Sequence, residues 1–195
     1  MKKKLKRLKQ YLRFLTAKKI KFNVGSSGIN TDLDFYATDI DTLNITKDDD
    51  WRNLLMNLRV DNITAEHVWE HLSDVDTILA NKNCFKYLKK NGVLRLAVPD
   101  GLHPDENYIE YVRPGGSGLG ADDHKVLYTY KIMKERLESA GFRVDLLEYW
   151  DENGTFHFKD WNSENGYIMR SSKNDKRNKD GVLHYTSLIV DAIKM

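Results

Sequence analysis

The sequence has one cysteine, no long apolar run and no signal-peptide core, and each absence excludes a class of protein. The single cysteine, Cys84, cannot form a disulfide within the chain, so a reducing compartment is expected. No apolar run approaches the length of a membrane span. Lysines interrupt the N-terminal leucines throughout, which excludes the apolar core of a secretory signal. We therefore expect a cytoplasmic protein.

Charge is unevenly distributed along the chain. Of the 31 Lys and Arg residues, ten lie in residues 1–21, which contain no acid; the remaining 21 are set against 29 Asp and Glu. Such an acidic body lacks the broad basic face that nucleic-acid binding needs. Leu5, Leu8, Leu12 and Leu15 recur at helical spacing, which predicts a basic amphipathic helix over residues 1–19. We favour packing of this leucine stripe on the protein over weak contact with a membrane surface.

A glycine-rich turn between two short apolar runs is the first feature that indicates a ligand. Residues 20–24 lead into Gly25-Ser26-Ser27-Gly28, and a second run over residues 35–39 ends on Asp39. Open α/β sheets bind nucleoside cofactors in this way: glycines admit the ligand close to the backbone, and a carboxylate at the next strand end accepts from the ribose hydroxyls. Fourteen residues from Gly25 to Asp39 are too few for the usual intervening helix.

Four later segments carry a resemblance to a known family. They are AEHVWEHL (residues 65–72), LKKNGVLRLAVPDG (88–101), GADDHKVLY (120–128) and YTSLIVDAIK (185–194). From about residue 20 to the C-terminus the chain resembles the class I S-adenosylmethionine-dependent methyltransferases, in particular a bacterial and viral branch with such segments. The resemblance implies a single domain over residues 1–195. Its fold would be an α/β Rossmann-like, doubly wound, mostly parallel seven-stranded sheet with an antiparallel last strand.

The alternation of apolar runs and helical patterns agrees with that fold class. A capping box at Thr46–Asp49 predicts a helix start, and Gly92 and Gly141 predict helix ends. Strands are expected near residues 20–24, 35–39, 61–65, 93–98, 142–149 and 187–193, with helices near 74–90 and 124–139. Two polar, glycine-rich stretches, 100–123 and 150–181, follow strand ends and are expected on the substrate side.

The resemblance also implies the cofactor and the residues that bind it. S-adenosylmethionine would lie along the carboxyl edge of the sheet, with its methionine half on the glycine-rich turn and its ribose on the acid of the second strand. Its adenine would lie against residues 43–45, and its sulfonium beside the end of the strand over residues 61–65. The predicted cofactor-binding residues are Gly25, Ser26, Ser27, Asp39, Asn44, Glu66 and His67.

The segment Asp122-Asp123-His124 is the best candidate for acid–base chemistry. A histidine beside carboxylates can be oriented by one of them and can take a proton near neutral pH. It follows a glycine run and is expected at the start of a helix. The predicted catalytic residues are therefore His124, Asp123 and Asp122, and the predicted substrate contacts are His103, Arg170 and Arg177.

His67, Glu70 and His71 match the H-x-x-E-H motif of inverted zinc proteases, in which a helix places both histidines on one face. The motif follows a parallel-type strand, where the resembled family carries a Glu-His pair for structural reasons, so no metal is expected. We predict a methyltransferase that modifies an oxygen of a small polar acceptor such as a sugar or glycan hydroxyl. The alternatives are a zinc-dependent hydrolase built on this motif, or a non-catalytic module that docks on membranes through residues 1–19.

Overall fold

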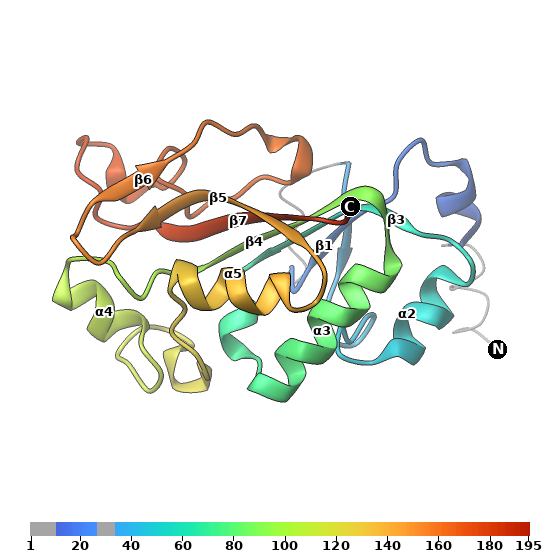
Figure 1. The fold of residues 1–195 in the computed structure, drawn as a ribbon, viewed down its shortest axis with the longest axis horizontal. Coiled ribbons are helices and arrows are strands. Elements are labelled where there is room, and N and C mark those ends of the chain that lie inside the picture. Colours follow the sequence, from blue (N-terminus) through green and yellow to red (C-terminus); the bar gives the residue numbers. More distant parts are fainter. Residues whose placement is uncertain (1–10, 27–33) are drawn as a thin grey trace.

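A seven-stranded mixed sheet runs through the molecule (Figure 1). The structure is a computed structural model that describes residues 11–26 and 34–195. Across the sheet the strands are ordered β2 (Tyr36–Thr38), β1 (Lys21–Val24), β3 (Val60–Glu66), β4 (Leu88–Pro99), β7 (Ser187–Ile193), β5 (Arg143–Trp150) and β6 (Phe156–Phe158). The first four pair in parallel, whereas β7 is antiparallel to both β4 and β5, and β6 is antiparallel to β5. The predicted mostly parallel sheet with an antiparallel last strand is confirmed.

Helices cover one face of this sheet (Figure 1). They are α2 (Asp48–Leu55), α3 (Asp74–Tyr87) and α5 (Tyr130–Glu138), with α4 (Glu106–Val112) near the carboxyl end of β4. Alternate strand residues such as Ile63, Leu94 and Val190 point to this side and form the main core with Trp51 and Met133 of the helices. Burial of such apolar area is the main driving force of the fold.

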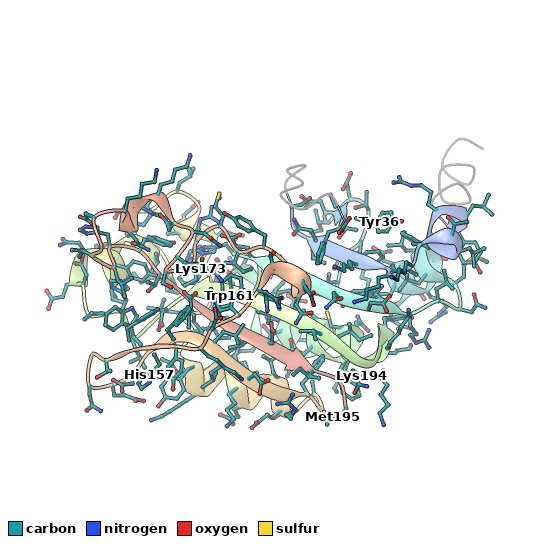
Figure 2. All side chains as sticks on the ribbon, turned by 90° about the horizontal axis from the view of Figure 1, so that it is seen from above. Tyr36, His157, Trp161, Lys173, Lys194 and Met195 are labelled. Atoms are coloured by element: carbon teal, nitrogen blue, oxygen red, sulfur yellow. The ribbon has the colours of Figure 1, made fainter. Side chains whose placement is uncertain are left out.

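The opposite face is covered by a long irregular segment between β6 and β7, which we call the late segment (residues 159–186) (Figure 1). Trp161 and Ile168 of this segment pack with Ala97 of β4 and Ile189 of β7 in a second apolar cluster. Figure 2 looks onto this face and shows Trp161 beside Lys173, whose ammonium lies 3.8 Å from the ring centroid. The late segment contains most of the predicted substrate-side insertion, residues 150–181.

Two predicted helix boundaries at α2 and α3 are wrong. Thr46 does not cap α2, because its hydroxyl bonds Asn44 Oδ1 at 2.7 Å, and Lys47 occupies the N-cap without a side-chain bond. The α3 helix ends at Tyr87 and does not extend to residue 90, since Leu88 already pairs with Val60 in the sheet. Gly92 therefore lies within β4 and is not a helix stop.

The helix predicted near residues 124–139 begins later than expected. Thr129 caps α5 by accepting the Ile132 N–H, so the helix spans Tyr130–Glu138. Residues 124–127 are irregular, and Tyr128 bridges to Asp100 at the carboxyl end of β4. His124 is thus held in a connecting segment that crosses the edge of the sheet. Gly141, at φ +102°, lies just after the end of α5, as expected.

The N-terminal helix is described from residue 11 and runs over residues 11–16; Leu5 and Leu8 lie outside the described residues. Its buried residue is Phe14, which packs edge-on against Tyr36. Leu12 and Leu15 are each 52% exposed, so the predicted packing of these two leucines is wrong. Membrane contact by this helix stays a prediction. Within residues 11–26 and 34–195, no helix combines the length and hydropathy needed to cross a bilayer.

Candidate active site

The carboxyl ends of four parallel strands meet at one edge of the sheet. The register aligns Val24 of β1 with Thr38 of β2 and Ala65 of β3, and it aligns Glu66 of β3 with Ala97 of β4. In parallel sheets this is the edge where ligands bind. The turns that follow these strands carry most of the residues singled out from the sequence.

The turn after β1 packs closely on neighbouring backbone and side chains. Gly25 has φ +65°, a region that disfavours residues with a side chain, and a Cβ there would collide with Cγ2 of Val68. Ser26 donates from its backbone N–H to the Thr38 carbonyl oxygen at 3.2 Å. The turn after β1 is thereby joined to the end of β2 and to the segment after β3. The third predicted residue of this turn, Ser27, lies outside the described residues.

Asp39 directly follows β2, as predicted, and is half-buried. Its Oδ1 accepts the Ile40 N–H at 2.7 Å, and its backbone N–H donates to the Thr42 hydroxyl. A carboxylate has several acceptor positions, and hydrogen-bond acceptors are what a diol requires. Asn44 lies further along the same connection, where its Oδ1 accepts from both the N–H and the hydroxyl of Thr46. That oxygen therefore stabilises the turn before α2.

Glu66, the last residue of β3, anchors the late segment. Its carboxylate accepts the backbone N–H groups of Met169 and Arg170 at 3.0 and 2.8 Å, and the Arg170 guanidinium lies 3.4 Å away. A predicted cofactor ligand and a predicted substrate contact are thus bonded to each other. In this structure the Glu66 carboxylate serves as a tether for residues 169–170.

The H-x-x-E-H stretch is not an α-helix, so the helical zinc-protease geometry is wrong for this chain. His67 has φ +56°, and only Trp69–His71 form a single 3₁₀ turn. The His67 ring turns toward β7, where Nε2 lies 3.1 Å from the Ser187 hydroxyl oxygen. His71 points elsewhere, because its Nδ1 lies 3.3 Å from Asp123 Oδ2. The two histidines therefore do not act as a pair on one face.

A different set of side chains converges beside this turn. One nitrogen each of His71 and His124 and one carboxylate oxygen of Glu70 lie within 4.8 Å of one another. We call Glu70, His71 and His124 the histidine–glutamate cluster. The two imidazole rings meet edge to face at 4.7 Å between centroids. Glu70 is fully buried, whereas both histidines are partly exposed, so the cluster is open to solvent on the histidine side.

The two aspartates next to His124 do not orient it, contrary to the prediction. The Nδ1 of His124 lies 2.7 Å from the Val112 carbonyl oxygen, which can only accept a hydrogen bond. The proton is therefore on Nδ1, and Nε2 keeps its electron pair. Asp123 instead contacts His71 and bonds Lys125 at 2.7 Å, while Asp122 is exposed.

Tyr185 connects this cluster to the arginines of the late segment by way of His67, whose Nδ1 lies 3.1 Å from Oε1 of Glu70. Its ring stacks on His67 at 6.2 Å between centroids, and the Arg177 guanidinium lies 3.5 Å from the Tyr185 ring centroid. Arg177 also forms a two-bond pair with Asp175, at 2.9 and 2.6 Å. Burial raises the pKa of Tyr185 to about 12, so its hydroxyl stays protonated near neutral pH. Arg170 and Arg177, both predicted from sequence, therefore lie near the cluster.

His103 is not placed to touch a substrate as predicted, since only 5% of it is exposed. It stacks on Tyr108 at 4.0 Å and meets Trp150 edge to face. Burial lowers the pKa of His103. Its neighbour Asp100 is also buried and accepts the Trp150 and Leu102 N–H groups; burial raises the pKa of Asp100 to about 6. Both residues brace the connection after β4.

Glu70 and His71 were not among the site residues predicted from the sequence. Their signal is the H-x-x-E-H match, which by itself predicts a helical zinc site. The carbonyl of Val112, which fixes the tautomer of His124, gives no sequence signal because any residue could supply it.

Two solved structures share the fold at low sequence identity. A SAM-dependent methyltransferase from Archaeoglobus fulgidus aligns with a TM-score of 0.50 at 16% identity, over 96% of this chain and 90% of that chain. A SAM-dependent methyltransferase from Thermotoga maritima, described as a possible histamine N-methyltransferase, aligns with a TM-score of 0.53 at 11% identity, over 98% and 89%. No family model and no curated protein sequence matches this chain. The likeness establishes a Rossmann-like fold of the kind these methyltransferases have.

Proposed function

We propose that this protein is an S-adenosylmethionine-dependent methyltransferase that methylates an oxygen of a small polar acceptor, such as a sugar or glycan hydroxyl. Support comes from the fold, shared with two methyltransferases across nearly the whole chain. The observation that carries the proposal is local: the connections after β1, β2, β3 and β4 bring Gly25, Asp39 and the histidine–glutamate cluster to one edge of the sheet.

The residues at this edge fit the cofactor. Gly25, held at positive φ with no room for a side chain, brings bare backbone to the edge, as nucleoside-binding turns require. Asp39 provides a carboxylate after the neighbouring strand, where it can accept from both ribose hydroxyls. S-adenosylmethionine would supply an electrophilic methyl group on a sulfonium. Gly25 and Ser26 would hold its methionine half, and Asp39 its ribose.

Activation of the acceptor falls to His124. A hydroxyl is a poor nucleophile while protonated, and a positioned base accelerates its reaction by roughly 10²–10⁴-fold. The Val112 carbonyl fixes the Nδ1–H tautomer, so Nε2 of His124 offers its electron pair at a partly exposed position. This electron pair would accept the proton of the acceptor hydroxyl while the hydroxyl oxygen attacks the methyl group from the side opposite the sulfonium.

The acceptor class is proposed from the composition of the late segment. Arg170, Arg177 and Tyr185 present donors near the cluster, which suits a hydroxyl-rich molecule. The same segment also has a polar cavity of about 520 Å³ that includes Trp161 and Tyr167 in its lining. Aromatic and amide side chains mixed in this way are typical of carbohydrate sites.

The test has two stages. Calorimetric titration with S-adenosylhomocysteine checks cofactor binding, and absence of binding at millimolar concentration would refute the methyltransferase proposal. A mass-spectrometric screen with S-adenosylmethionine and a panel of sugars and glycans then looks for a gain of one methyl group. Methylation confined to amines or thiols would refute the oxygen acceptor while leaving the reaction class intact.

A further inference from the structure

The histidine–glutamate cluster contains a buried carboxyl group whose oxygens have no hydrogen-bond partner among the described residues. Glu70 is fully buried, and neither of its carboxylate oxygens has a hydrogen-bond partner among residues 11–26 and 34–195. The Nδ1 of His67 lies 3.1 Å from Oε1, but the contact does not have hydrogen-bond geometry. A buried carboxylate without partners costs several kcal/mol, so such groups are normally paired or bind a metal.

His124 is held as a metal-ligating histidine usually is, and His71 has a carboxylate beside its ring. A ligating imidazole donates its other ring N–H to a carbonyl or carboxylate, which fixes the tautomer and the direction of the electron pair. His124 has such a partner in the Val112 carbonyl oxygen at 2.7 Å, and the Asp123 carboxylate lies 3.3 Å from Nδ1 of His71. In His124 this leaves Nε2 as the electron-pair donor.

We propose that Glu70, His71 and His124 bind a divalent transition-metal ion, with zinc as the best chemical match. Two imidazole nitrogens and one carboxylate oxygen form the ligand set of many zinc sites that keep a fourth position open. Magnesium and calcium prefer oxygen ligands alone and fit the set poorly. Binding would draw the three donor atoms from within 4.8 Å to about 3.3 Å, the edge of a tetrahedron with bonds of about 2.0 Å.

This site differs from the zinc motif considered from the sequence. That motif needs His67 and His71 on one helix face, whereas here His124 comes from a connection more than 50 positions later. The expectation of no metal came from the position of that motif after a strand and from the resembled family, and it did not consider His124 as a ligand. The convergence of Glu70, His71 and His124 gives a reason to revise it.

The open position of the ion would face the partly exposed histidine side of the cluster. There a bound metal could lower the pKa of an acceptor hydroxyl, with His124 acting as a ligand in place of a free base. Only this role rests on the proposed methyltransferase function; binding of the ion does not.

Zinc binding is tested by calorimetric titration of metal-free, full-length protein with zinc chloride. We expect one saturable site per chain. Glu70→Gln and His124→Gln should each lower zinc affinity by at least about 100-fold, beyond the 10–100-fold typical for loss of an outer partner. Asp123→Asn, which removes the negative charge beside His71, should lower it about tenfold, whereas Asp122→Asn should not. S-adenosylhomocysteine affinity, measured on the same samples, separates a failed metal site from a failed cofactor site.

The matched control is His184→Gln, because His184 also pairs with an aspartate, Asp180, at 2.7 Å but lies exposed and outside the cluster. Nitrogen-15 spectra of the six histidines of the wild type avoid any doubt about folding of the variants. Zinc should shift the Nε2 resonance of His124 and a ring-nitrogen resonance of His71, and it should leave the resonances of His184 in place. Absence of saturable binding, or equal loss of affinity in His184→Gln, would overturn the proposal.

Discussion

Arg95 and Asp191 face each other across β4 and β7 and form two parallel hydrogen bonds, from Nε to Oδ1 at 2.7 Å and from Nη2 to Oδ2 at 2.8 Å. Both residues are buried. The remaining nitrogen of Arg95 donates to the carbonyl oxygens of Asn162 and Gly166. One guanidinium thus joins the middle of the sheet to the segment that covers it.

Loss of this guanidinium should destabilise the protein and loosen the late segment. Arg95→Met leaves Asp191 buried without its cation and should lower the free energy of unfolding by about 3–5 kcal/mol. Urea unfolding measures this change, and amide hydrogen exchange should rise first in residues 160–170. Arg113→Met, which breaks an exposed pair with Glu110, should change the free energy of unfolding far less, because water and salt screen exposed pairs. Equal losses of unfolding free energy in the two variants would show that the buried Arg95–Asp191 pair stabilises the protein no more than the exposed pair does.

Asp39→Ala should weaken binding of S-adenosylhomocysteine. Removal of a carboxylate that accepts two hydrogen bonds from the ribose costs about 1.5–3 kcal/mol, or roughly a 10–100-fold rise in Kd. Isothermal titration calorimetry gives the Kd directly. Asp41→Ala, an exposed carboxylate two positions later, is the control and should bind like wild type. Unchanged affinity in a folded Asp39→Ala protein would remove Asp39 from the site.

His124→Gln should lower kcat by roughly 10²–10⁴-fold and leave cofactor affinity nearly intact. The amide can still donate to the Val112 carbonyl, so the local fold is kept, but it provides no imidazole electron pair. Steady-state rates with the acceptor found by the screen measure the effect, and His184→Gln serves as the control. Wild-type kcat in His124→Gln would place acceptor activation elsewhere.

The stability of the protein should fall as pH rises from about 4 to 6, because of Asp100. Burial raises the pKa of this carboxyl from 3.8 to about 6, so in that window the folded state binds more protons than the unfolded chain. The contribution of this one group is on the order of 3 kcal/mol, lost by pH 6–7. Urea unfolding at pH 4.5, 5.5 and 6.5 measures the slope.

The comparison variant for this pH effect is Asp100→Asn, which cannot titrate and should flatten the slope. Its amide accepts only one of the two backbone N–H groups, so its absolute stability should drop by about 1 kcal/mol at low pH. Asp160→Asn, at an exposed carboxylate, should keep the wild-type slope. A slope unchanged by Asp100→Asn would assign the pH dependence to another group.

Six of the seven strands were predictable, because they are apolar runs and because local pattern and pairing agree. The seventh, β6, was missed because its three residues lie in the polar stretch 150–181. Boundaries failed where a tertiary contact overrode the local signal. Leu88 leaves α3 to pair with Val60, and Thr46 bonds Asn44 and does not cap α2. The predicted packing of Leu12 and Leu15 was wrong for a similar reason, since Phe14 packs against Phe22 of β1 and Tyr36 of β2 in their place.

The candidate site was only partly predictable, since a sequence pattern shows which residues are near in the chain and not which converge. Asp39 and Gly25 follow from strand ends, a local property. His71 and His124 meet only because the chain after α4 folds back toward the turn after β3. The tautomer of His124 depends on a backbone carbonyl group. The prediction that Asp122 and Asp123 orient His124 was wrong, because neighbouring residues in a 3₁₀ turn point in different directions.

The late segment has a consequence for how this protein can change. The same stretch of chain covers one face of the sheet through Trp161 and Ile168 and brings Arg170 and Tyr185 to the edge where the cluster lies. Substitutions that alter the shape of that edge therefore also act on the cover of the sheet. Mutations that change the shape of this edge should therefore need stabilising substitutions in the core under the late segment. Laboratory evolution of the proposed acceptor specificity should begin from a stabilised variant of the protein.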